Sequence, residues 1–179
     1  MGRRDHLKDY VPTEDGGYEY AGTRWSWPSG EIRASFLKDA RQLLIASIVC
    51  LVGAGCIPAP GSFGAFYVVI PFAIGAIGTA LSAAALFRLS REQDPMRGHV
   101  YTASVPALPT KLLVGAVGDA VCGAAALVHG LVLPFTAGDG GAPVLSVSFA
   151  LIMLLAAVCL WRIRSDLAEI VFIREKGSA

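Results

Sequence analysis

The hydrophobic positions of this chain gather in four long stretches that carry almost no charge. They cover residues 43–57, 65–87, 112–135 and 144–161. Each stretch approaches the roughly 20 residues that a helix, rising about 1.5 Å per residue, needs to cross about 30 Å of hydrocarbon. Helices of a soluble bundle keep one polar face toward water, but these stretches are apolar on every side. The pattern therefore predicts an all-α fold, an integral membrane bundle of four transmembrane helices.

The residues between the stretches set the boundaries of the predicted bundle. The run Pro58-Ala59-Pro60-Gly61 and the glycines at 138–141 stop helices and turn the chain, so two short hairpin turns are expected. The expected spans are residues 42–58, 65–87, 111–134 and 143–162, within a transmembrane domain at 42–165 that includes a longer loop at 88–110. Residues 1–41 are expected to form an N-terminal arm and a juxtamembrane helix, and residues 166–179 a helical extension of the last span.

Composition supports the membrane prediction. Apolar residues make up 54% of the 179 and charged residues 16%, and the mean hydropathy is +0.57, which lies outside the usual balance of soluble domains. Residues 1–40 are polar with charges of both signs, unlike a cleavable secretory signal. The first apolar stretch is therefore expected to remain in the mature protein.

The basic residues all fall on one side of the predicted bundle. Seven Lys and Arg precede the first stretch, four lie between the second and third, and four follow the fourth, which accounts for all 15. Because basic residues stay on the cytoplasmic side, this distribution predicts that both termini and the loop at 88–110 are cytoplasmic. The net charge of +1 gives no indication of a nucleic-acid partner, and none is predicted.

The polar segments at the two ends of the chain have patterns of their own. The N-terminal arm is rich in aromatic residues, unlike a simple disordered tail, and such rings favour a membrane interface or a partner surface. Ser29 is predicted to cap a helix that runs directly into the first span. After the fourth stretch, apolar residues from Ile163 to Val171 recur at helical spacing, which predicts an amphipathic extension that rests on the membrane or on a partner.

The residue types that build metal, cofactor and hydrolytic sites are not arranged for those functions here. The four cysteines lie within or at the ends of apolar stretches without Cys-x-x-Cys spacing, so they are interpreted as packing residues. The sequence has no His-Glu-x-x-His helix and no Gly-x-Ser-x-Gly elbow. No catalytic, cofactor-binding or metal site is predicted, and an enzyme that uses residues of the loop at 88–110 stays open as a third alternative.

Asp119 is the one acidic residue inside an apolar stretch, and it is the first candidate site residue. It lies eight residues beyond Lys111, which places it about 12 Å along the helix from the predicted cytoplasmic end. A carboxylate at a transmembrane helix centre costs about 2.5 to 3.5 kcal/mol, so such residues normally face a bundle interior or an aqueous cavity. Two interpretations stay open: a proton or cation site, and a protonated or hydrogen-bonded residue that holds helices together.

His129 is the second candidate, ten residues and about 15 Å further along the same predicted helix. Gly115, Asp119, Cys122, Ala126 and His129 follow one another in steps of four and three, so they are predicted to form one stripe. Small residues let a neighbouring helix approach and polar ones bond across, so the stripe is interpreted as a helix-packing surface. A proton relay between Asp119 and His129 would need polar partners on the facing helices, which offer only scattered Ser and Thr.

Three short motifs carry a resemblance to a known group. They are Tyr18-x-Tyr20-x-Gly22 ahead of the basic helix, Pro58-Ala59-Pro60-Gly61 after the first span, and the lone acid in the third. In this combination the chain resembles small bacterial four-span integral membrane proteins over most of its length. The resemblance implies a bacterial plasma-membrane location and carries over no activity, cofactor or catalytic residue.

Two functions from different classes follow as expectations. Small size, short outer turns, small-residue helix faces and an aromatic arm favour a non-enzymatic accessory or regulatory subunit of a membrane assembly, with the lipid bilayer and a membrane-protein partner as its expected contacts. The alternative is a small homo-oligomeric transporter or channel in which Asp119 responds to ions or protons. The two predicted helix pairs run in the same direction, so they are not inverted repeats, and self-association would be needed to enclose a pore.

Overall fold

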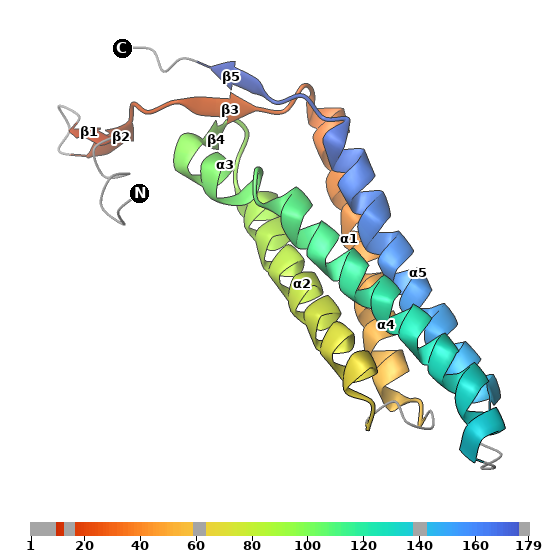
Figure 1. Ribbon diagram of the computed structural model, residues 1–179. Helices are drawn as coiled ribbons and strands as arrows, with labels where there is room; N and C mark the ends of the chain where they lie inside the picture. Colours follow the sequence, from red (N-terminus) through yellow and green to blue (C-terminus); the bar gives the residue numbers. More distant parts are fainter. Residues whose placement is uncertain (1–9, 13–16, 59–63, 138–142, 176–179) are drawn as a thin grey trace.

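Four long helices form the main body of the protein. The computed structural model describes residues 10–12, 17–58, 64–137 and 143–175. The long helices are α1 (Gly30–Cys56), α2 (Phe66–Arg91), α4 (Leu108–Ala137) and α5 (Pro143–Ala168) (Figure 1). Within these ranges four helical segments are long and apolar enough to cross a membrane, which confirms that part of the prediction. Residues 59–63 and 138–142, where the hairpin turns are expected, lie outside the described part.

The helices begin and end where local chemistry allows. The Ser29 side chain accepts a hydrogen bond of 3.2 Å from the backbone N–H of Ile32, so Ser29 caps α1 as predicted. From there α1 continues without a break through the first apolar stretch and ends at Cys56, shortly before Pro58. Pro109 lies in the first turn of α4, where a missing N–H costs nothing.

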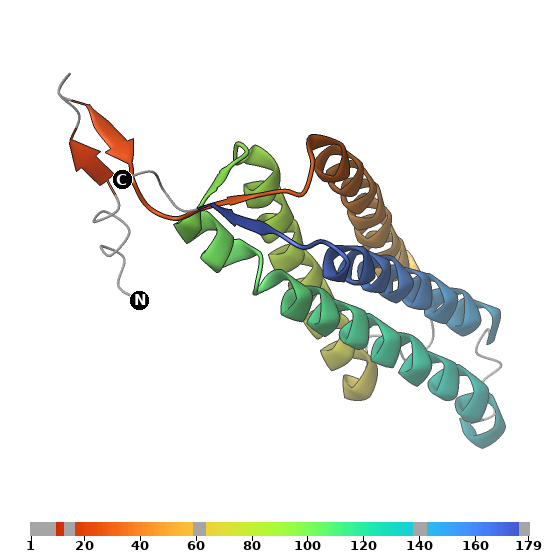
Figure 2. The same cartoon turned by 90° about the horizontal axis from the view of Figure 1, so that it is seen from above.

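The packing order of the helices differs from their order in the chain. α4 lies between α2 and α5, and α1 packs mainly on α5 (Figure 2). α1 and α2 contact each other only slightly. The bundle is therefore closed along three helix pairs and open along the fourth.

Two clusters of buried apolar side chains fill the bundle, one toward each end. The first joins all four long helices with α3 and the segments around it, through residues such as Leu44, Leu89, Leu112 and Leu160. The second lies nearer the opposite end and includes Leu51, Val68, Cys122 and Met153. The buried polar side chains described below lie in the section of the bundle between these two clusters.

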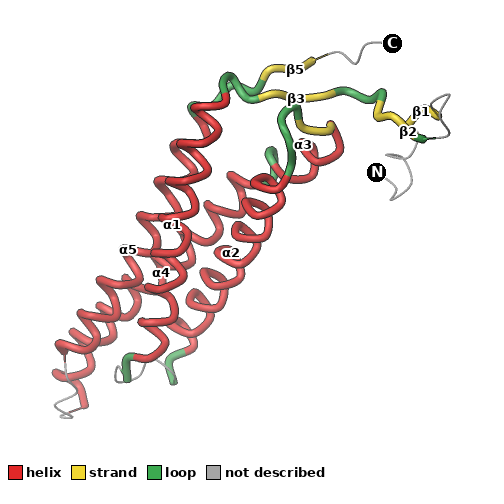
Figure 3. The backbone as a smooth tube through the Cα atoms, turned by 180° about the vertical axis from the view of Figure 1, so that it is seen from behind, coloured by secondary structure: helices red, strands yellow, loops and turns green. Residues whose placement is uncertain are grey.

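Short strands lie at the end of the bundle where α1 begins and α5 ends. The elements are β1 (Tyr10–Pro12), β2 (Tyr18–Tyr20), β3 (Arg24–Ser26), β4 (Met96–Arg97), the short helix α3 (Gly98–Ser104) and β5 (Ile173–Glu175). β3 lies in the middle of a sheet and pairs antiparallel with both β4 and β5, as Figure 3 shows from behind. These short strands add to the helical bundle and were not predicted. We call this end the sheet end and the opposite end the loop end.

The last helix is shorter than the sequence pattern indicates. The predicted helical extension over 166–179 is wrong for residues 169–175, because the chain turns after Ala168 and forms β5, and residues 176–179 lie outside the described part. β5 pairs along the edge of β3, and Phe172 packs edge-on against Trp27 with ring centroids 4.8 Å apart. These tertiary contacts override the helical spacing of the apolar residues at 170 and 171.

The N-terminal arm is anchored to the bundle by its aromatic residues. Trp25 stacks on Tyr101 of α3 with ring centroids 4.0 Å apart and an interplanar angle of 5°. The Tyr20 hydroxyl accepts a hydrogen bond of 3.0 Å from the backbone N–H of Gly98. The arm, the segment after α2 and the C-terminal strand are thus held together at the sheet end.

Candidate functional site

The candidate site lies where α2 and α4 approach most closely. Glycines face each other there, Gly75 and Gly78 on α2 against Gly115 and Gly118 on α4. A Cβ atom built at Gly78 would lie 2.4 Å from the backbone nitrogen of Gly115, and one built at Gly118 would lie 2.5 Å from that of Gly75. No side chain fits in either place, so the glycines permit direct backbone contact between the two helices.

Asp119 occupies the space next to this glycine contact. Its side chain is fully buried, and a Cβ built at Gly75 would lie 1.9 Å from its Oδ1 atom. Neither carboxyl oxygen has a hydrogen-bond partner among the described residues. An ionised carboxylate without a partner is very costly in such a place, so this carboxyl is suited to holding a proton, a water molecule or a cation.

Two further buried hydroxyls lie in the same middle section of the bundle as Asp119, between the two apolar clusters, and Thr79 is level with Gly115, about one helical turn from Asp119 toward the sheet end. Ser47 of α1 sits between Leu44 of the sheet-end cluster and Leu51 of the loop-end cluster, and Thr79 of α2 lies between the two clusters in the same way. Like the carboxyl, both hydroxyls lack a partner within the described part of the chain. We call Ser47, Thr79 and Asp119 the mid-bundle polar layer. Three helices each contribute one oxygen-bearing side chain to it, and such ligands suit protons, water and hard cations.

Burial alone does not explain the missing partners. The hydroxyl of Ser82 on α2 is also fully buried, but it donates a hydrogen bond of 2.8 Å to the backbone oxygen of Gly78 one turn earlier. Serine and threonine in membrane helices commonly find a partner in this way. Thr79, on the same helix, does not.

The remaining residues of the predicted stripe lie along the interior of α4. Gly115 meets α2, Cys122 donates a weak hydrogen bond of 3.5 Å from its Sγ to the backbone oxygen of Val68, and Ala126 is buried in the loop-end cluster. These three residues serve helix packing in the structure. The stripe faces α2 over much of its length.

His129 belongs to a separate contact. Its Nδ1 atom is hydrogen-bonded to the hydroxyl of Tyr67 on α2, and the two rings lie 5.6 Å apart between centroids. About 15 Å of helix separates it from Asp119. The structure therefore joins His129 to Tyr67 near the loop end and does not join it to the mid-bundle polar layer.

A groove runs between α1 and α2 in the sheet-end half of the bundle. It has a volume of about 900 Å³. The buried side chains of Leu44 and Leu86 line its floor, while the exposed Lys38 and Arg41 lie at its mouth. Its α1 lining residue farthest from the sheet end, Ile45, is two residues from Ser47, and Ala83 on α2 is four residues from Thr79. We call it the α1–α2 groove, and it reaches to within about one helical turn of the mid-bundle polar layer.

Sequence reasoning found Asp119 but missed what surrounds it. Ser47 and Thr79 were recognised only as scattered polar residues, since their level depends on how four helices align. The partner of His129 was missed because Tyr67 reads as an aromatic residue at the end of a span.

No protein-family model matches the chain, and comparisons with curated proteins and with solved structures gave no significant match. The resemblance drawn from the short motifs stays a prediction.

Proposed function

We propose that this chain is a multi-pass protein of a bacterial plasma membrane, with the sheet end in the cytoplasm and the loop end outside. The length and hydropathy of the four helices support insertion. The charges support the orientation. Every described basic residue lies in the sheet-end elements or in the helix turns next to them, and the described residues of the loop end have none.

Within that membrane, the chain acts as a non-enzymatic accessory or regulatory subunit that binds a helix of another membrane protein. The observation that carries this proposal is the α1–α2 groove. α1 packs well on α5 but hardly on α2, so one side of the bundle presents an apolar hollow instead of a fourth helix contact. A transmembrane helix about 10 Å wide could lie along this side and complete the packing.

The lining of the groove indicates the chemistry of its occupant. Ala40 and Ala83 line the groove with small side chains, and small residues allow another helix to approach closely. Lys38 and Arg41 at the mouth pair with no acidic side chain in the described ranges. The proposed occupant is therefore an apolar helix of a partner protein with an acidic residue near its cytoplasmic end.

Photo-crosslinking tests the groove directly. A photoreactive residue at Ile45, in the groove, is expected to give one discrete protein adduct in native membranes. The matched control is Val117 on α4, which is exposed at nearly the same level and lies outside the groove. The proposal predicts an adduct from position 45 and none from position 117. Equal labelling, or lipid adducts alone from both, would overturn it.

A second candidate function is favoured by the mid-bundle polar layer. A buried carboxyl with no partner among the described residues, about two helical turns along α2 from the lining of the α1–α2 groove, fits a proton or cation site of a small homo-oligomeric transporter. In that case Asp119→Asn abolishes ion-dependent flux in liposomes that contain the purified protein. An unchanged flux would remove Asp119 from the mechanism.

A further inference from the structure

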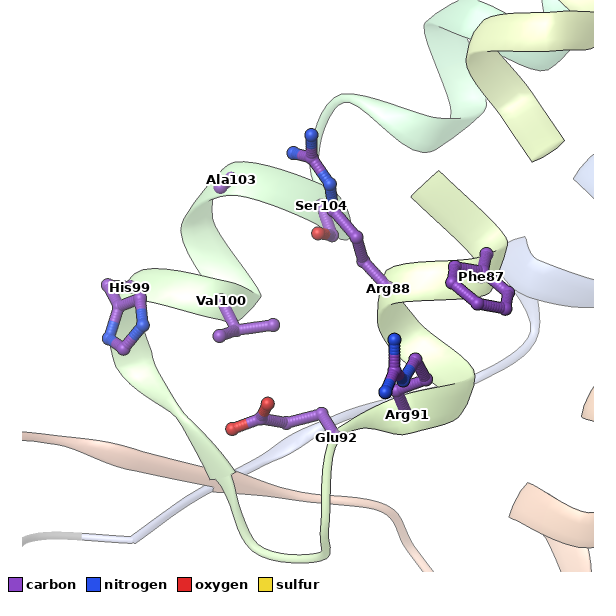
Figure 4. Close-up of a pocket in the computed structure, with 8 residues that line it drawn as sticks. All are labelled: Phe87, Arg88, Arg91, Glu92, His99, Val100, Ala103 and Ser104. Carbon is purple, nitrogen blue, oxygen red and sulfur yellow. The ribbon is translucent and has the colours of Figure 1, made fainter. Parts of the chain in front are cut away.

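A second hollow lies where the last turn of α2 meets α3, and it shares Phe87 with the α1–α2 groove. It has a volume of about 340 Å³, and Figure 4 shows the residues that line it. The α2 side contributes Phe87, Arg88, Arg91 and Glu92, and the α3 side contributes His99, Val100, Ala103 and Ser104. We call it the α2–α3 pocket. In the figure the Arg88 side chain extends from α2 across the pocket toward Ser104.

The pocket holds positive charge that no acidic side chain of the described residues neutralises. Neither Arg88 nor Arg91 forms an ion pair with an acidic residue of the described part, and Arg91 instead lies over the Phe87 ring at 5.4 Å from its centroid. Basic residues in a last helical turn also offset the negative end of the helix dipole. Compensation of the helix dipole does not require a pocket between α2 and α3, nor a histidine on the α3 side of that pocket.

The one acid in the pocket is already engaged. The carboxylate of Glu92 accepts a hydrogen bond from Nε of Arg97 at 2.7 Å, within an ion pair of the same two residues. This contact raises the pKa of Arg97 above its ordinary value, chiefly through the hydrogen bond to Glu92 and next through the one to Tyr10. Glu92 therefore does not cancel the charge of Arg88 and Arg91.

We propose that the α2–α3 pocket binds the phosphate headgroup of an anionic phospholipid. Two guanidinium groups present the forked donors that match phosphate oxygens, and the His99 ring and the Ser104 side chain lie on the opposite wall. The pocket lies at the end of an apolar helix, at the level where headgroups meet basic residues. The exposed ring of Phe87 begins the apolar surface along which an acyl chain continues.

Native mass spectrometry of the full-length protein tests this proposal, with phosphatidylglycerol and phosphatidylcholine as the probe lipids. The protein is expected to retain phosphatidylglycerol in preference to phosphatidylcholine. The double variant Arg88→Gln/Arg91→Gln is expected to lower phosphatidylglycerol retention roughly tenfold to thirtyfold. Arg162→Gln/Arg164→Gln is the matched control, since it removes two charges from the same end of the bundle but leaves the pocket intact.

A second variant separates pocket occupancy from charge. Ala103→Trp fills the pocket from α3 while keeping every arginine, and it should lower retention as the arginine variant does. This variant carries the test if the arginine variant fails to fold. Equal retention by Ala103→Trp and the wild type would overturn the proposal, as would an equal loss in the Arg162/Arg164 control. Displacement of phosphatidylglycerol by millimolar inorganic phosphate would also overturn it, because the site would then serve a soluble phosphate.

Discussion

The side chain of Asp119 on α4 packs against the backbone of Gly75 on α2. A Cβ atom at position 75 would lie 1.9 Å from Oδ1 and 3.1 Å from the backbone nitrogen of Asp119. The carboxyl therefore fits only because residue 75 has no side chain. The two residues interact through steric packing and not through a hydrogen bond.

Gly75→Ala is expected to destabilise the bundle. The added methyl group must displace the carboxyl or separate α2 from α4, and overpacking of this kind costs about 1–3 kcal/mol. Gly53→Ala on α1 is the matched control, because a Cβ there meets no atom within 4 Å. Because alanine favours a helix more than glycine does, Gly53→Ala should leave the free energy of unfolding unchanged or raise it by up to about 1 kcal/mol. Unfolding of both variants in a denaturing detergent measures the difference, and equal stability would contradict the close contact.

Asp119→Asn is expected to leave the free energy of unfolding within about 1 kcal/mol of the wild type. The amide has nearly the same size, and the carboxyl oxygens lose no partner in the described part of the protein. Asp119→Glu keeps the carboxyl but adds a methylene group that must enter the space against Gly75. It should lower the free energy of unfolding by about 1–3 kcal/mol. Thermal melting in mild detergent ranks the three proteins. A loss above about 2 kcal/mol in Asp119→Asn would mean that the carboxylate binds an ion in the folded protein.

Tyr67→Phe is expected to cost about 0.5–1.5 kcal/mol through loss of its hydrogen bond to His129. The same exchange at the largely exposed Tyr18 should have no effect. A double-mutant cycle with His129→Leu isolates the pair: a coupling energy near zero would show that the two side chains do not interact.

The proposed orientation predicts which surface thiols a membrane-impermeant maleimide reaches in intact cells. In a background without the native cysteines, Gly64→Cys at the loop end should label from outside, because position 64 is exposed. Thr102→Cys on α3 is also exposed and should label only after the membrane is permeabilised. The reverse pattern would invert the topology.

The bundle was predictable because long apolar stretches and a serine cap act locally. Ser29 caps α1 as its position indicates, and the four helices match the predicted spans at 111–134 and 143–162 in full and those at 42–58 and 65–87 to within two residues. The strand β5 was not predictable in the same way. The apolar residues before it, as far as Val171, recur at helical spacing, and β5 forms only because the edge of β3, about 150 residues earlier in the chain, is there to pair with it.

The candidate site was predictable in its centre but not in its surroundings. A lone acid in an apolar stretch identifies Asp119 at once. Thr79 and Ser47 do not stand out, since a buried hydroxyl such as that of Ser82 can bond within its own helix. That three polar residues fall between the same two apolar clusters depends on the alignment of the helices, which no single stretch encodes.

The mass of the intact complex after gentle extraction from native membranes tests the proposed function most directly. The account predicts a stoichiometric membrane-protein partner that Ala83→Phe, which fills the α1–α2 groove, displaces. Ala84→Phe, on the neighbouring residue that faces away from the groove, should keep that partner. A chain that extracts alone or only with copies of itself, or a partner that both variants retain, would contradict the account.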